Sequence, residues 1–119
     1  MLKREVKSFG YAIKGVISAF KSEKHLQFHL LAAAAVTALG FWLKLNTIEW
    51  SIIIICIAMV FVAELFNTAI EKLVDLVSPE YNKTAGLIKD VAAGAVLLAS
   101  IAAAIVGVLV IGNKCCTLY

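Results

Sequence analysis

Four polar side chains recur at helical spacing in an otherwise apolar stretch of the chain. They are Glu64, Asn67, Glu71 and Asp75, separated by 3, 4 and 4 positions, and we call them the polar stripe. This spacing places all of them on one face of a helix. An ionisable side chain in hydrocarbon costs several kcal/mol unless it is paired, neutralised or beside water, so it marks a functional site by default.

The position of Glu64 favours acid–base chemistry. It follows Trp50 by fourteen residues, which is about 21 Å along a helix and still inside the hydrocarbon near one boundary. A carboxylate held there could act as a general base on a group at the membrane surface. The alternative is a glutamate that makes one interhelical hydrogen bond. The continuation of the same face through Asn67 and Glu71 favours the functional interpretation.

The composition indicates a membrane protein. The 119 residues are 62% hydrophobic and only 16% charged, with a mean hydropathy of +0.95. A soluble domain of this size carries about a quarter charged residues. Three cysteines without a CxxC pair predict neither a disulfide framework nor a zinc site. We therefore expect one all-α membrane-embedded domain over 1–119.

Periodicity predicts the helices that position the stripe. Residues 5–24 have apolar positions at spacings of three and four with lysines between them, which predicts an amphipathic helix in the membrane interface. Three apolar spans follow, at about 28–45, 50–70 and 91–113. Pro79, the single proline, should end the second helix.

The basic residues predict the orientation. Six of the 11 Lys and Arg residues precede position 25, and the connection 71–90 holds three more, whereas Lys44 and Lys114 stand alone in the other two polar segments. Positive residues remain on the cytoplasmic side, so the N-terminus and this connection should be cytoplasmic and the C-terminus outside. A basic N-terminal cluster could also serve nucleic acid, but beside so apolar a chain we favour the membrane surface and expect no nucleic acid partner.

The cytoplasmic segments combine acids and bases. Among their charged side chains are the carboxylates Glu23, Glu71, Asp75, Glu80 and Asp90 and the cations Arg4, Lys72, Lys83 and Lys89. Mg²⁺ takes one or two carboxylates together with substrate phosphates, although composition alone equally allows an ordinary solvated loop. The chain has no GxxxxGK[ST] motif and no kinase glycine-rich loop, so helix-borne charges would have to hold any nucleotide. His25 and His29 lack a third metal ligand, and we expect interfacial hydrogen bonds from them.

Several runs resemble the prokaryotic diacylglycerol kinase and undecaprenol kinase family. They are Glu64–Glu71 (ELFNTAIE) with Val74-Asp75, Lys89–Val96 (KDVAAGAV), and the N-terminal Gly10-Tyr11, Lys14-Gly15 and Ser22-Glu23. The resemblance covers nearly the whole chain. It implies a homotrimer of three-span subunits, each with an amphipathic surface helix, in the bacterial cytoplasmic membrane.

The resemblance also implies direct in-line transfer of the γ-phosphoryl group of ATP to a membrane lipid alcohol. Glu64 would be the general base, supported by Asn67, and Glu64 and Arg4 would contact the lipid. Glu23 and Glu71 would bind Mg²⁺. The residues implied at the nucleotide are Arg4, Tyr11, Glu23, Glu71, Glu80, Tyr81, Asn82, Lys89 and Asp90.

Two features qualify the resemblance. Asn82 stands where many members have histidine. Ala12 and the Val91–Ala95 run are closer to the undecaprenol kinase branch, which favours undecaprenol over diacylglycerol as the acceptor.

The competing function is a small proton-coupled transporter in which buried Glu64 binds and releases protons. Such transporters usually have more spans and an inverted or parallel repeat, and no repeat is visible here. A purely structural subunit would leave the polar stripe unexplained.

Overall fold

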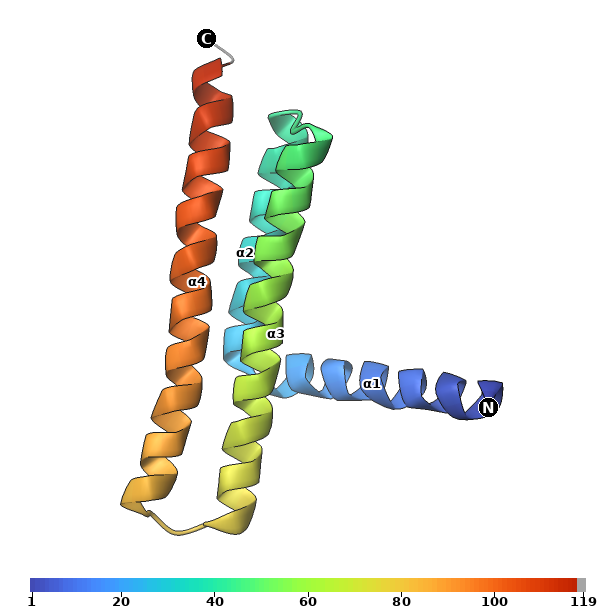
Figure 1. The fold of residues 1–119 in the computed structure, drawn as a ribbon, viewed down its shortest axis with the longest axis vertical. Coiled ribbons are helices and arrows are strands. Elements are labelled where there is room, and N and C mark those ends of the chain that lie inside the picture. The colour runs from blue at the N-terminus through green and yellow to red at the C-terminus, as the bar shows by residue number, and fades with distance from the viewer. Residues whose placement is uncertain (118–119) are drawn as a thin grey trace.

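The computed structural model describes residues 1–117, which form four helices (Figure 1). These are α1 (Leu2–Ser22), α2 (Lys24–Trp42), α3 (Thr47–Val77) and α4 (Lys83–Thr117). The last three are each long and apolar enough to cross a membrane. The prediction of an all-α chain with three spans is therefore confirmed.

The spans stand side by side, and α1 projects sideways from them (Figure 1). Near its C-terminal end α1 reaches the bundle, where the Phe20 ring lies 5.5 Å from that of Phe61 on α3. Elsewhere it projects away, and Phe9 and Ile13 are 72% and 58% exposed. Beyond the level of α1, α3 and α4 continue to the connection that joins them. Charged side chains on this overhang are thus held past the apolar part of the bundle.

The corner between α1 and α2 is a single residue. Glu23 has φ −107° and ψ 116°, an extended conformation that interrupts helical hydrogen bonding. The predicted surface helix over 5–24 therefore ends two residues early, and α2 starts at Lys24 rather than at about residue 28. The apolar content marks where the span crosses, but α2 already begins in the polar residues that precede it.

The turn between α2 and α3 also differs from the prediction. The first span was expected to continue to about residue 45, but α2 ends at Trp42 and the chain turns through Lys44, whose φ is 55°. Asn46 then caps α3: its side chain accepts from the Glu49 N–H at 2.9 Å, and the Glu49 carboxylate accepts from the Asn46 N–H at 2.8 Å. This capping box starts α3 at Thr47, three residues before the predicted start.

At the opposite end of the bundle, α3 ends at its predicted stop but α4 begins earlier than predicted. Past the predicted end of the second span near residue 70, α3 continues to Val77, where Ser78 and Pro79 stop it as predicted. Helix α4 begins at Lys83, eight residues before the predicted third span, because Asn82 caps it. Near the turn between α2 and α3, Lys114 of α4 pairs with Glu49 at 3.4 Å.

Tight packing occurs beside the same turn. Leu43, Leu45 and Ile53 form a buried cluster. Gly40 lies against the Trp50 ring, and a β-carbon at Gly40 would be 2.7 Å from Trp50 Cη2. Most of α4 is exposed, with Ala92 as its one buried residue. In a bilayer this apolar surface faces lipid or other protein, so a single subunit has little internal core.

Replacing Gly40 should reveal this close approach. We expect Gly40→Ala to destabilise the protein by about 1–3 kcal/mol, because the added methyl group overlaps the Trp50 ring. The matched control is Gly112→Ala, whose β-carbon meets nothing within 4 Å and which should be neutral or gain up to about 1 kcal/mol of helix propensity. Thermal unfolding in detergent measures both. Equal midpoints for the two variants would contradict the packing described here.

Candidate active site

The polar stripe lies on one face of α3, and its burial changes along the helix. Glu64 is 4% and Asn67 9% exposed, whereas Glu71 is half-buried and Asp75 is exposed. The stripe therefore runs from inside the bundle towards the charged connection between α3 and α4. The same set of side chains can contact an apolar region at one end and water at the other.

The Glu64 carboxylate faces a histidine from another helix. His29 Nε2 of α2 lies 3.4 Å from Glu64 Oε1, and the two side chains are 19% and 5% exposed. The sequence predicted only interfacial hydrogen bonds from His29, and this contact was not predicted. One signal was available: His29 is the last ionisable residue before the uncharged stretch from Leu30 to Leu43, so it lies just inside the span.

Asn67 contacts the next acid of the stripe. Its Nδ2 donates to Glu71 Oε1 at 3.4 Å, while its Oδ1 is buried and has no donor among the described residues. The resemblance implied that Asn67 supports Glu64. In this subunit its side chain supports Glu71 instead, and a direct role towards Glu64 stays a prediction.

The start of α4 returns charged residues to the stripe. Lys89 Nζ pairs with Asp75 Oδ1 at 2.5 Å, which joins α4 to the exposed end of the stripe. Asp90 is exposed beside it. Of the predicted nucleotide residues, Lys89 and Asp90 therefore lie on the helix that faces the exposed end of the stripe.

The connection before α4 holds three more predicted nucleotide residues. Glu80 and Tyr81 are exposed, Tyr81 to 92%. Asn82 Oδ1 accepts from the backbone N–H groups of Thr84 and Ala85 at 2.8 and 3.3 Å, so its side chain caps α4. An Asn immediately before a helix is a recognisable capping signal, so this role of Asn82 could have been predicted from the sequence.

The residues predicted on α1 are not brought to the stripe within one subunit. Arg4 and Tyr11 are exposed on the half of α1 that projects from the bundle (Figure 1). They line a shallow hollow together with Lys3 and Lys7. Their proposed contacts with nucleotide and lipid therefore stay predictions.

The predicted metal ligands are available but do not form a closed cage. Glu23, at the corner between α1 and α2, and Glu71 are both half-buried. Across residues 1–117, no three His, Cys, Asp or Glu side chains come together closely enough to hold a metal. Carboxylate oxygens are suitable Mg²⁺ ligands, and Mg²⁺ is usually bound by one or two of them plus substrate phosphates. The donor set fits an ion that arrives with a nucleotide.

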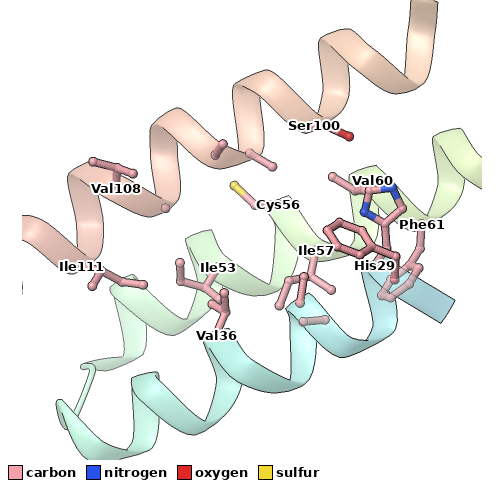
Figure 2. A pocket seen from close by; sticks show the side chains of 16 residues that line it. His29, Val36, Ile53, Cys56, Ile57, Val60, Phe61, Ser100, Val108 and Ile111 are labelled. Carbon is pink, nitrogen blue, oxygen red and sulfur yellow. The ribbon is translucent and has the colours of Figure 1, made fainter. Parts of the chain in front are cut away.

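An apolar groove of about 480 Å³ opens beside His29 (Figure 2). Side chains of α2, α3 and α4 line it, among them Val36, Ile53, Ile57, Val60, Val108 and Ile111. His29 and Phe61 lie together towards one end and Val108 and Ile111 towards the other. Ser100 contributes a buried hydroxyl that has no partner among the described residues. The groove thus places a long apolar surface next to the partner of Glu64.

Fold and site together define an integral membrane protein with an acidic site at one end of its bundle. The chain belongs to the prokaryotic diacylglycerol kinase family, whose sequence model matches residues 10–111. This confirms the family that the ELFNTAIE and KDVAAGAV runs indicated.

Named relatives cover most of the chain. It is 42% identical over 109 residues to an undecaprenol kinase of Bacillus subtilis, covering 92% of this chain and 89% of the relative. It is 43% identical over 101 residues to a diacylglycerol kinase of Synechocystis, covering 84% and 58% respectively. With a diacylglycerol kinase of Escherichia coli K12 it shares 32% identity over 102 residues, covering 86% and 84%.

Introducing a negative charge at Asn67 should test whether this position of the polar stripe is buried. We expect Asn67→Asp to destabilise the protein by about 1–3 kcal/mol, because it sets a second carboxylate against Glu71 at a position only 9% exposed. Asn82→Asp is the matched control: aspartate caps as well as asparagine and suits a helix N-terminus, so its stability should be unchanged or slightly higher. Unfolding curves in detergent compare them, and similar losses in both would contradict the burial of Asn67.

Proposed function

We propose that this protein transfers the γ-phosphoryl group of ATP to the hydroxyl of a membrane lipid alcohol, preferring undecaprenol to diacylglycerol. It belongs to the prokaryotic diacylglycerol kinase family and its named relatives are lipid kinases, so the predicted enzyme class is confirmed. The observation that carries the mechanism is Glu64, a carboxylate 4% exposed and set within an apolar helix. Family membership leaves the transporter alternative without support.

The polar stripe suits a reaction between a lipid and a soluble nucleotide. A lipid hydroxyl remains at the interface, so its base should lie just beneath the headgroups, where Glu64 is buried. The nucleotide approaches from the exposed end of the stripe, near Asp75 and Lys89. Phosphoryl transfer depends on alignment and charge neutralisation more than on covalent chemistry by the protein. Mg²⁺ held by Glu23 and Glu71 would neutralise the phosphates.

The distribution of charged and exposed residues supports an orientation in the membrane and an assembly. The positive residues place the N-terminus and the connection between α3 and α4 in the cytoplasm and the C-terminus outside. With its exposed apolar residues, α1 lies in the interface. We propose a homotrimer, since only Ala92 of α4 is fully buried in the single subunit and one subunit leaves Arg4 and Tyr11 away from the stripe.

Identity does not separate the two acceptors, since the undecaprenol kinase of B. subtilis shares 42% and the diacylglycerol kinase of Synechocystis 43% identity with this chain. The preference for undecaprenol rests on Ala12 and the Val91–Ala95 run, and on the apolar groove beside His29, which suits one long hydrocarbon chain. Rates on undecaprenol and on diacylglycerol in matched mixed micelles test the preference directly.

Neutralising Glu64 should abolish turnover and spare the fold. We expect Glu64→Gln to lower kcat by at least about 100-fold, because the lipid hydroxyl loses its base. Phosphorylation is followed with labelled ATP and lipid products separated by thin-layer chromatography. Glu5→Gln, on the exposed face of α1, is the control with the same charge change and should match the wild type. Substantial activity in Glu64→Gln would contradict the role of Glu64 as the general base. Proton flux through the wild-type protein without any labelled lipid would support the transporter instead of the kinase.

Glu71 should control the magnesium requirement. In Glu71→Gln we expect half-maximal activity to need about tenfold more Mg²⁺, equivalent to about 1.4 kcal/mol, because one carboxylate ligand is lost. Titrating Mg²⁺ at fixed ATP measures the shift, again with Glu5→Gln as control. A titration indistinguishable from the wild type would count against metal binding at Glu71.

A further inference from the structure

The contact between His29 and Glu64 joins two helices inside the bundle. The ring comes from the first full turns of α2 and the carboxylate from the middle of α3, with His29 Nε2 3.4 Å from Glu64 Oε1. Among residues 1–117 this is the single side-chain polar contact of the Glu64 carboxylate. The orientation of the acid on which the proposed reaction depends is therefore set from α2.

The His29 ring is largely buried beside aromatic side chains. Its side chain is 19% exposed, and the neighbouring Phe28 ring meets it edge-on at 5.8 Å. It lines the apolar groove close to Phe61 of α3 (Figure 2). A largely buried ring has fewer alternative rotamers than an exposed one, so it can fix the direction of a group it contacts.

A histidine in this position can direct the carboxylate without taking part in the chemistry. With its proton on Nε2, the ring carries a donor 3.4 Å from Glu64 Oε1. The second oxygen, Oε2, then stays available to accept the proton of a lipid hydroxyl. Since catalysis is sensitive to small errors of alignment, a carboxylate free to rotate would be a weaker base.

We propose that His29 is a positioning residue, which holds the Glu64 carboxylate in the orientation needed to accept the hydroxyl proton. The inference rests on the proposed function, in which Glu64 is the base. It assigns no proton transfer to His29 itself.

The chain supplies a matched control on the same helix. His25 lies one turn before His29 on α2 and is exposed. Replacing His25 by phenylalanine makes the same chemical change away from Glu64. At position 29, phenylalanine keeps the ring shape without a donor, while glutamine keeps an N–H close to the position of Nε2.

Steady-state kinetics of His29→Phe, His29→Gln and His25→Phe test the proposal in mixed micelles. We expect His29→Phe to lower kcat by about 10- to 100-fold with KM for MgATP within about twofold of the wild type. His29→Gln should recover most of that loss, and His25→Phe should behave as the wild type. Full kcat in His29→Phe beside an inactive Glu64→Gln would overturn the positioning role and leave the proposed function standing.

A second measurement does not depend on activity. In protein labelled with ¹⁵N-histidine, Glu64→Gln should shift the ring-nitrogen resonances of His29 and leave those of His25 unchanged. If Glu64→Gln retained activity, the proposed base would fail on its own, while these resonances would still report the contact. Should His29→Phe not fold, His29→Gln and the resonances decide: unchanged His29 resonances in Glu64→Gln would overturn the proposal.

Discussion

The structure depends on the cost of holding a carboxylate inside an apolar helix bundle. Glu64 is 4% exposed, and several kcal/mol would be lost if it were ionised there without compensation. The protein compensates locally by setting His29 of α2 against the carboxylate and by continuing the same helix face through Asn67 to half-buried Glu71. The required pairing constrains how α2 and α3 can rotate against each other, so the acid helps to specify the packing that contains it.

The connection between α3 and α4 then completes the charged end of the bundle. Pro79 stops one helix and Asn82 starts the next, and this short reversal brings Lys89 back to Asp75. Because both helices extend past the level of α1, these charges lie beyond the apolar part of the bundle. Exposure to water therefore rises along α3 from the buried Glu64 to the ion pair of Asp75 with Lys89. This arrangement needs only helical spacing along α3 and the turn that joins α3 to α4.

Sequence alone predicted the parts that depend on periodicity and composition. The three spans, the end of α3 before Pro79 and the polar stripe all follow from local patterns. The contact between His29 and Glu64 did not, because it requires the relative depth and rotation of two helices, which tertiary packing sets. The corner at Glu23 and the capping box of Asn46 moved helix ends by a few residues for purely local hydrogen-bonding reasons. Arg4 and Tyr11 remain apart from the stripe because α1 projects from a single subunit.

The apolar groove beside His29 has a consequence for directionality. A lipid whose terminal group is an uncharged alcohol can slide its tail along such a wall and present the hydroxyl at the histidine end. Once that end bears a phosphate of nearly two negative charges, entry to the same dry surface becomes strongly unfavourable. Under the proposed function, with the acceptor in this groove, the groove would admit acceptor and reject product, which would reduce product inhibition and favour lateral escape into the headgroup layer.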